Sequence, residues 1–261
     1  MTDAQLLSVL TGILGLAVGS FLNVVIHRVP DGASLLRPPS SCPGCGARIA
    51  PRDNVPVVSW LLLRGRCRRC AAPISARYPA VEILTGVLFV LVTLRLGATW
   101  ALPAYLYAAA MGVALAVIDI RVHRLPDAIV FPSYGVLAVL LTVAAAAEGE
   151  WWSLLRAVLG GLVLFGAYLV IMIAYPAGMG PGDVKLAGLL GGLLGWFGWG
   201  VLAVGGFAAF LFGGLFGLTL MVVRRADGKT KVPFGPWMIL GAAVGVAWGP
   251  ELWSAYVGLM L

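Results

Sequence analysis

Charged side chains are scarce in this sequence of 261 residues: only 11% are Asp, Glu, Lys or Arg, whereas 61% are hydrophobic. A soluble domain typically carries about 25% charged residues. A water-soluble fold of this length would need a polar surface that the sequence cannot supply. The scarcity therefore excludes an ordinary soluble domain and favours a membrane protein.

The few charges are also clustered, which leaves long stretches without any Asp, Glu, Lys or Arg. Such stretches cover residues 4–26, 96–118, 128–147, 157–182, 186–223 and 232–250. A membrane helix needs roughly 20 apolar residues, so the fifth stretch is long enough for two helices. A shorter one, 83–94, reaches spanning length if it extends back to Tyr78. The sequence therefore predicts an all-α polytopic membrane protein with about eight transmembrane helices in the lipid bilayer.

The first apolar stretch lacks the features of a cleaved secretory signal. The residues before it include Asp3 and no Lys or Arg, and its apolar run is too long for a signal h-region. We therefore expect it to be retained as the first transmembrane helix.

The net charge of +7 is compatible with nucleic-acid binding or with the positive-inside rule of membrane proteins. The basic residues form four groups: nine Arg from Arg28 to Arg77; Arg121 and Arg124; Lys185; and Arg224, Arg225, Lys229 and Lys231. With eight helices and an outside N-terminus, all four groups fall on the cytoplasmic side. Only Arg95 and Arg156 fall outside. The pattern favours a membrane topology, and no nucleic-acid partner is expected.

All four cysteines lie in one polar segment, as Cys42-Pro-Gly-Cys45 and Cys67-Arg-Arg-Cys70. Each Cys-x-x-Cys turn can place two thiolates on one metal, and two such turns complete a tetrahedral zinc site. Two disulfides or a redox pair are the alternatives, and a cytoplasmic location argues against stable disulfides. We predict a structural zinc that supplies folding energy to this segment. Four Cys ligands leave no open position, so a catalytic zinc is not expected.

The composition divides the chain into three parts. Residues 1–27 form the first transmembrane helix, residues 28–77 the small cytoplasmic zinc segment, and residues 78–261 a bundle of seven membrane helices. Glycine is abundant within the bundle, above all in residues 186–218. In lipid, small residues allow helices to approach closely, so we assign these glycines to packing.

Two aspartates fall at the predicted cytoplasmic edge of the membrane. Asp119 ends an inward-running helix and Asp183 begins an outward-running one. Ionisable residues at such places are costly and point to function. Two neighbouring carboxylates can share a proton, so that one acts as base on water and the other donates to a peptide carbonyl. This is aspartyl protease chemistry. Gly178, Gly180 and Gly182 would let the backbone open and a substrate approach.

Blander interpretations remain open for the acidic residues. Asp119 can pair with Arg121 or Arg124, Asp183 can cap its helix beside Lys185, and Asp127 is expected to be the N-cap of the next helix. Paired intramembrane acids also suit a proton- or cation-coupled transporter. That alternative predicts carboxylates near the midplane and leaves the cysteines unexplained. A noncatalytic assembly scaffold would leave the acid pair idle.

Several motifs resemble those of one known family. Gly180-Pro-Gly-Asp183 followed by Lys185 resembles the signature of the GxGD membrane aspartyl proteases, in particular the bacterial prepilin peptidases. The similarity extends over nearly the whole chain. Further motifs that carry it are Gly19–Pro30, the cysteine tetrad with Asn54–Trp60, Arg77–Glu82, Leu125-Pro-Asp127 and Pro233-Phe-Gly-Pro236.

The resemblance implies a catalytic pair, Asp119 and Asp183, and an active-site loop that contains Gly180, Gly182 and Lys185. It implies cleavage of type IV prepilins and type II secretion pseudopilins at the cytoplasmic face of the bacterial inner membrane. It also implies N-methylation of the new N-terminus with S-adenosylmethionine, with a peptidase lacking this second activity as the alternative. The pilus or type II secretion machinery would then be the partner.

Overall fold

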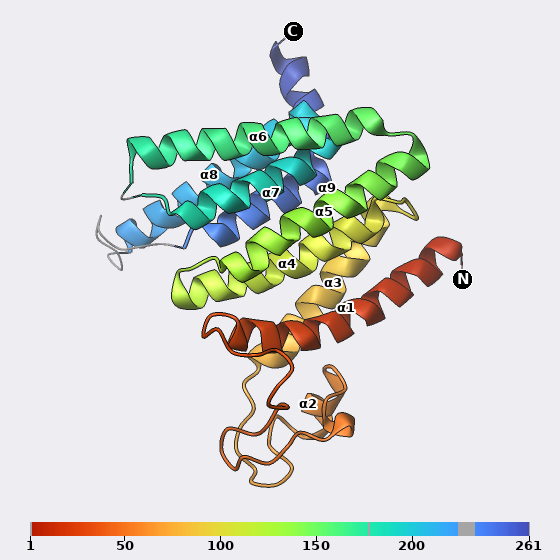
Figure 1. Ribbon diagram of the computed structural model, residues 1–261, viewed down its shortest axis with the longest axis vertical. Helices are drawn as coiled ribbons and strands as arrows, with labels where there is room; N and C mark the ends of the chain where they lie inside the picture. The colour runs from red at the N-terminus through yellow and green to blue at the C-terminus, as the bar shows by residue number, and fades with distance from the viewer. Residues whose placement is uncertain (1, 177, 224–232, 261) are drawn as a thin grey trace. The chain divides into compact units, whose positions relative to one another are not determined.

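The computed structural model describes residues 2–176, 178–223 and 233–260 (Figure 1). Within these ranges the chain forms helices and no β-strand, apart from isolated bridges at Ser41–Arg48 and Arg66–Pro73. The predicted all-α class is therefore confirmed. The last basic group, residues 224–231, lies outside the described residues.

The elements follow one another in a simple order. They are α1 (Asp3–Arg28), η1 (Pro51–Asp53), α2 (Val58–Leu62), α3 (Arg77–Leu96), α4 (Leu102–Val122), α5 (Asp127–Glu148), α6 (Trp151–Ala174), α7 (Pro181–Phe197), α8 (Trp199–Val222) and α9 (Gly235–Met260). Among the described residues, six helices are long and apolar enough to cross a membrane, namely α1, α3, α4, α5, α6 and α8. Two further long helices, α7 and α9, accompany them. The fold is thus that of a polytopic membrane protein.

The chain forms two compact units, residues 1–114 and residues 115–261, and α4 crosses the division. The first unit holds α1, the cysteine segment and α3. The second holds the last turns of α4 and all of α5 to α9. The three-part division expected from composition stays a prediction.

In the first unit, α1 and α3 pack along each other through small residues. A Cβ added to Gly15 would lie 2.8 Å from the Cα of Gly86, so the two backbones touch there. The Thr93 hydroxyl donates to the Thr11 hydroxyl at 2.8 Å, which satisfies a buried polar pair. In lipid, helices associate by such close packing and interhelical hydrogen bonds, because lipid tails are as apolar as the side chains.

In the second unit, α6 packs on α7, and α8 packs on α9. A Cβ on Gly160 of α6 would lie 3.0 Å from the Cα of Gly195, and a Cβ on Gly245 of α9 would lie 3.0 Å from the Cα of Gly205. The packing role is confirmed for Gly195 and Gly205, whereas a Cβ added to Gly214 or Gly217 would meet no atom within 4 Å. The tight α5–α6 turn depends on Gly149, whose φ of +75° suits a residue without Cβ.

Arg156, one of the two basic residues that the topology left outside, has a structural role. Its Nη2 donates to the carbonyl of Trp196 at 3.1 Å, in the last turn of α7. Carbonyls at a helix C-terminus lack partners within the helix, and a cation there is favourable. The exception to the positive-inside pattern is thus explained by a helix cap.

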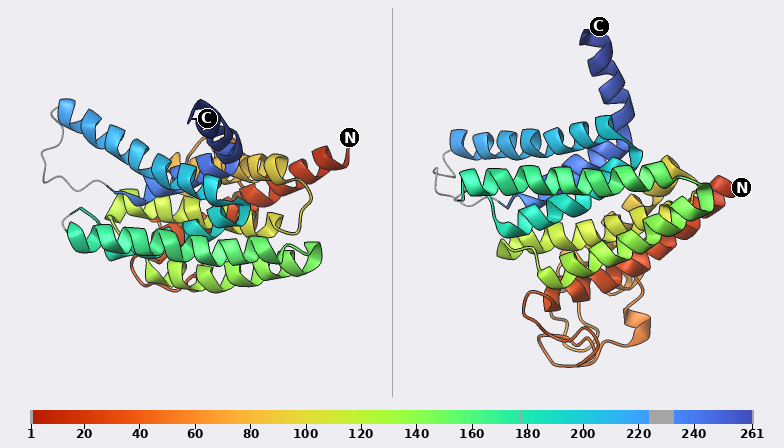
Figure 2. Two further views of the ribbon diagram at one scale, coloured as in Figure 1. Left: turned by 90° about the horizontal axis from the view of Figure 1, so that it is seen from above. Right: turned by 45° about the horizontal axis from the view of Figure 1, so that its top comes forward.

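Three helix ends meet at one end of the second unit, where the α4–α5 turn and the starts of α7 and α9 lie together (Figures 1 and 2). Asp119 belongs to the last turn of α4, Asp183 to the first turn of α7, and Gly235 begins α9. Segments far apart in the sequence are thereby brought to one place.

Candidate active site and metal centre

Asp119 is buried, with only 5% of its surface exposed, and its carboxylate faces the start of α9. Its Oδ2 accepts a hydrogen bond from the backbone N–H of Gly235 at 3.0 Å. The first N–H groups of a helix have no partner within the helix, so Asp119 satisfies one of them from a distant part of the chain. The alternative role of Asp119, an ion pair with Arg121 or Arg124, does not explain why its carboxylate binds the Gly235 amide.

Asp183 is the third residue of α7 and folds back on the start of its own helix. Its Oδ2 accepts the backbone N–H of Gly180, the N-cap residue, at 3.0 Å. The interpretation of Asp183 as the N-cap is therefore wrong, because Gly180 is the N-cap and Asp183 binds its N–H from the third position of the helix. This bond accounts for one carboxylate oxygen only. The carboxylate also interacts electrostatically with the carboxylate of Asp119 and with the hydroxyl of Tyr168. The structure thus brings together the two aspartates singled out in the sequence.

The two carboxylates are held in the same way. Each uses Oδ2 to accept one glycine N–H at a helix N-terminus, Gly235 for Asp119 and Gly180 for Asp183. Helix N-termini carry partial positive charge, which favours a nearby carboxylate. In each carboxylate, Oδ1 takes no part in this bond.

The glycines of the site serve close approach rather than unusual backbone torsions. Gly180 has a φ of −88°, and Gly182 lies within α7. A Cβ added to Gly182 would lie 3.1 Å from Cβ of Leu125, and one added to Gly235 would lie 2.8 Å from Oδ2 of Asp119. Three segments therefore pack tightly around Leu125, and the expected opening of the backbone for substrate stays a prediction.

Lys185 is held by three side chains of α5. Its Nζ pairs with both carboxylate oxygens of Asp127 at 2.8 and 2.9 Å and lies 4.9 Å from the ring centre of Phe131. The Tyr134 hydroxyl donates to the Lys185 carbonyl at 2.7 Å. The N-cap interpretation of Asp127 is wrong, because Pro126 is the N-cap and Asp127 binds Lys185 instead. The contacts fix the first turn of α7, and with it Asp183.

Three aromatic rings pack beside the start of α9. The ring centres of Tyr168 and Phe210 are 5.1 Å apart, and Phe234 lies 6.3 Å and 5.4 Å from them. Phe234 directly precedes Gly235, so the rings support the amide that binds Asp119. Tyr168 and Phe210 were missed in the sequence because an aromatic residue inside an apolar helix gives no signal of its own.

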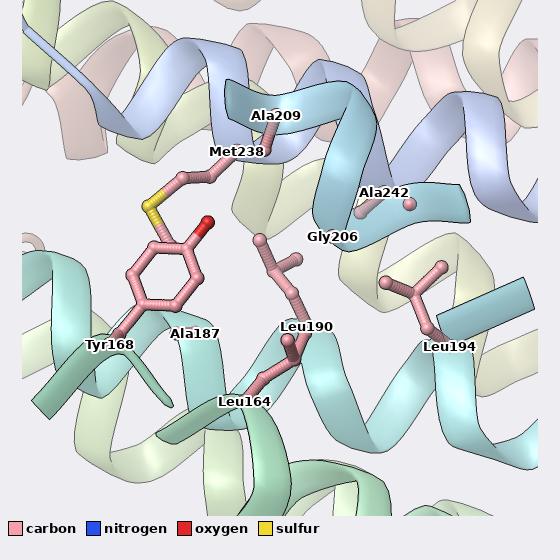
Figure 3. A pocket seen from close by; sticks show the side chains of 10 residues that line it. Leu164, Tyr168, Ala187, Leu190, Leu194, Gly206, Ala209, Met238 and Ala242 are labelled. Carbon is pink, nitrogen blue, oxygen red and sulfur yellow. The ribbon is translucent and has the colours of Figure 1, made fainter. Parts of the chain in front are cut away.

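A small pocket lies among α6, α7, α8 and α9 (Figure 3). Its walls include Leu190, Leu194 and Met238, and the Tyr168 hydroxyl is the single polar side-chain group among its lining residues. Figure 3 shows the Tyr168 ring beside the Met238 side chain. This lining has no carboxylate, imidazole or ammonium group and therefore offers no acid–base pair.

The cysteines of the first unit form one cluster. The Sγ atoms of Cys42, Cys45, Cys67 and Cys70 all lie within 4.8 Å of one another, and those of Cys42 and Cys70 are 3.7 Å apart. Tetrahedral zinc with Zn–S bonds of about 2.3 Å needs sulfurs about 3.8 Å apart. The donor set and its spacing therefore fit a four-coordinate metal centre.

The two cysteine turns have nearly the same backbone geometry. The N–H of Cys42 donates to Ala47 at 2.9 Å, and the N–H of Cys67 donates to Ala72 at 2.8 Å. Hydrogen bonds from the backbone N–H groups of Cys70 and Arg69 lower the pKa of the Cys67 thiol to about 6. A thiolate is the form that binds metal, so these two amides favour the metal-binding form of Cys67.

Two family models match the chain. Residues 13–96 match the Bacterial Peptidase A24 N-terminal domain, and residues 105–222 match the Type IV leader peptidase family. The first match contains the cysteine tetrad, and the second contains Asp119 and Asp183.

Curated relatives match over nearly the full length. The prepilin leader peptidase/N-methyltransferase of Stutzerimonas stutzeri is 35% identical over 94% of this chain and 92% of that protein. The protein of the same name from Neisseria gonorrhoeae is 34% identical over 98% and 96%. That of Myxococcus xanthus is 40% identical over 87% of this chain and 67% of that protein. No solved structure matches the chain.

Proposed function

The chain is an enzyme of the prepilin leader peptidase/N-methyltransferase family, and we propose that it cleaves prepilin leader peptides with Asp119 and Asp183 as its acid–base pair. The observation that carries this mechanism is the arrangement of the two carboxylates. They interact with each other at one end of the second unit, and each is oriented by a glycine N–H.

In the proposed reaction one carboxylate removes a proton from a water molecule, whose oxygen attacks the scissile carbonyl carbon. The other carboxylate, protonated at the start, donates its proton to the carbonyl oxygen. The tetrahedral intermediate then collapses: the C–N bond breaks, and the leaving amine takes up a proton from the acid pair. Water is consumed, and no metal or redox partner enters the balance.

The glycine amides have a defined part in this reaction. Because Gly235 and Gly180 occupy Oδ2 of the two aspartates, the rotation of each carboxylate is restricted and Oδ1 is presented to water and substrate. Groups that are already oriented lower the activation barrier, because little entropy is then lost in orienting them in the transition state. Gly235 and Gly180 are therefore positioning residues. Lys185 acts indirectly, because it fixes the start of α7 and thereby the position of Asp183.

The positions of the aspartates support hydrolysis over ion coupling. Asp119 lies three residues before the end of α4, and Asp183 is the third residue of α7. A coupling site of a transporter is expected near the membrane midplane. The grouping of basic residues in the sequence supports a position of this end of the bundle at the cytoplasmic face of the inner membrane, where a leader peptide could reach it.

The cysteine tetrad would hold a structural zinc ion. Cys42, Cys45, Cys67 and Cys70 supply four thiolates, so the ion has no position left for water or substrate. When bound, it would join the two turns and stabilise a segment that has little apolar core. The reaction itself is assigned to the second unit.

The relatives are named as methyltransferases as well as peptidases. We therefore propose that the chain also N-methylates the new N-terminus with S-adenosylmethionine, without assigning residues to the methyl donor. Type II secretion pseudopilins are proposed as additional substrates, with the pilus or type II secretion machinery as partner.

The test is a cleavage assay with purified protein and a prepilin, followed by mass spectrometry of the new N-terminus. Wild type should cleave, and its product should gain the mass of one methyl group when S-adenosylmethionine is present. Asp119→Asn and Asp183→Asn should insert normally and lose cleavage. Wild-type rates in either variant would remove that aspartate from the mechanism. Cleavage without a methyl increment would leave a peptidase alone.

A further inference from the structure

The short helix α2 presents apolar side chains outward and polar groups inward. Val58, Leu61 and Leu62, the α2 face, share one side of the helix and are 50%, 60% and 78% exposed. Ser59 is buried instead, and its hydroxyl donates to the Arg52 carbonyl at 3.0 Å. A helix on the surface of a soluble protein normally turns its polar side to water and its apolar side inward. An exposed apolar patch such as the α2 face marks a site that binds another molecule or a membrane.

The first unit holds α2 beside the cytoplasmic start of a membrane-spanning helix. The N–H of Val57, the residue before α2, donates to Oε2 of Glu82 at 2.7 Å. Glu82 lies in the second turn of α3 and is followed by its uncharged stretch, residues 83–94. Glu82 therefore marks the boundary between the polar and apolar parts of α3, and α2 begins at that level.

The bond between Val57 and Glu82 and one further contact fix the orientation of α2. Val57 has φ of +61°, a conformation that β-branched residues rarely adopt, and its bond to Glu82 stabilises it. The indole N–H of Trp60 donates to the Ile74 carbonyl at 3.1 Å, three residues before α3 begins. The α2 face is therefore held in a fixed relation to α3 rather than swinging on a loose loop.

The charge around α2 indicates what binds to the α2 face. Residues 28–77 contain nine Arg against two Asp, which equals the net charge of the whole chain, +7. One of the two acids, Asp53, is already paired with Arg68 at 2.7 Å. Arg64 and Arg66, which follow α2 directly, are exposed. A surface with apolar side chains and adjacent Arg is complementary to the headgroup layer of anionic lipids.

We propose that the α2 face inserts into the inner leaflet of the membrane and that Arg64 and Arg66 bind the phosphates of anionic phospholipids. The side chains of Leu61 and Leu62 enter the upper acyl region, while the guanidinium groups stay at headgroup level. The segment that carries the cysteine tetrad is thereby attached to the membrane surface at a third point, besides its covalent links to α1 and α3.

The test uses the full chain with the photoreactive amino acid benzoylphenylalanine in place of Leu62, and a control protein with it in place of Arg48. Arg48 is exposed and lies in the first cysteine turn. Each protein is reconstituted into phosphatidylethanolamine vesicles with or without phosphatidylglycerol, illuminated, and analysed by mass spectrometry for phospholipid adducts. Because Leu62 is already exposed, the replacement should not disturb folding.

We expect at least about fivefold more lipid adduct at position 62 than at position 48, because only the former should reach the acyl region. Removal of phosphatidylglycerol, or the double change Arg64→Gln and Arg66→Gln, should lower the yield at position 62 severalfold. Equal yields at the two positions, or none at 62, would overturn insertion. A yield that does not respond to lipid charge or to the Arg changes would overturn the assignment of anionic lipid.

Discussion

The cysteine segment and the acid site are assembled in opposite ways. The cysteine tetrad comes from two local turns separated by 21 residues, and each turn forms its own backbone hydrogen bonds. The acid site joins Asp119, Asp183 and Gly235, which belong to three different helices. Ligands on a closed turn need a metal to join them, whereas groups on packed helices are held by the packing. The cysteine tetrad should therefore tolerate a change in the type of ligand atom. The acid site should not tolerate a small change in the position of its carboxylates.

Among the following changes, the largest effect is expected from moving a carboxylate of the proposed catalytic pair without removing its charge. Asp183→Glu lengthens the side chain by one methylene, so its oxygens leave the amide of Gly180. We expect kcat for prepilin cleavage to fall at least about 100-fold, since misplacement by about 1 Å can have this consequence. Single-turnover cleavage measures it. A variant within a factor of a few of wild type would mean that the position of the carboxylate is not fixed by its helix.

Gly235→Ala should be the next most damaging change. The new Cβ would lie 2.8 Å from Oδ2 of Asp119 and 3.2 Å from Cδ2 of Leu125, so the carboxylate must move. We expect kcat to fall about 10- to 100-fold with KM unchanged, because orientation of the acid, not binding, is disturbed.

The control for this change is Gly214→Ala in α8, where an added Cβ meets no atom within 4 Å. It should keep wild-type kinetics and thermal stability. A rise in KM with unchanged kcat in Gly235→Ala would indicate that Gly235 contacts the substrate rather than positioning Asp119.

The cysteine segment should respond in the opposite manner. Cys42→Ser with Cys45→Ser should abolish zinc binding measured by elemental analysis, and limited proteolysis should then cut within residues 28–76, because metal binding supplies folding energy to such segments. Cleavage activity should remain within about tenfold of wild type, since the acid pair lies on other elements.

Conservative replacement sharpens the contrast. Cys45→His should retain zinc, because zinc accepts imidazole nitrogen in place of thiolate. Stoichiometric zinc in the double serine variant would show that the tetrad is not the metal site. A loss of cleavage as large as that of Asp183→Glu would show that the two regions do not act separately.

The smallest effect is expected at the contact between α5 and α7. Asp127→Asn removes the ion pair with Lys185 while the Tyr134 hydroxyl still holds the Lys185 carbonyl. Because the pair is partly exposed, we expect only about a three- to tenfold fall in kcat, in line with the modest value of exposed ion pairs.

The matched control is Asp31→Asn, an exposed acid of the first unit, which should be silent. Adding Tyr134→Phe to Asp127→Asn should deepen the loss beyond either single change if both hold the same turn. If kcat changes negligibly in both single variants and in the double variant, the start of α7 is fixed by other contacts.

The membrane class, the helix positions and the cysteine cluster could be predicted because they depend on local features. Uncharged stretches of spanning length and paired Cys-x-x-Cys turns are visible without knowing the fold. The convergence of Asp119 and Asp183 could also be expected, since counting helices places both at the same edge. The partners of these residues could not be predicted in this way.

The sequence by itself determined the type of protein, its helices, the grouping of its basic residues and the two groups of candidate site residues. Only the tertiary structure decided which backbone amide meets Asp119, that Lys185 belongs to Asp127, and that the α2 face points outward. The physical reason is the range of the interactions. Hydropathy, charge and turn geometry are properties of neighbouring residues. A hydrogen bond between residues 119 and 235 arises only when packing has brought distant helices into contact.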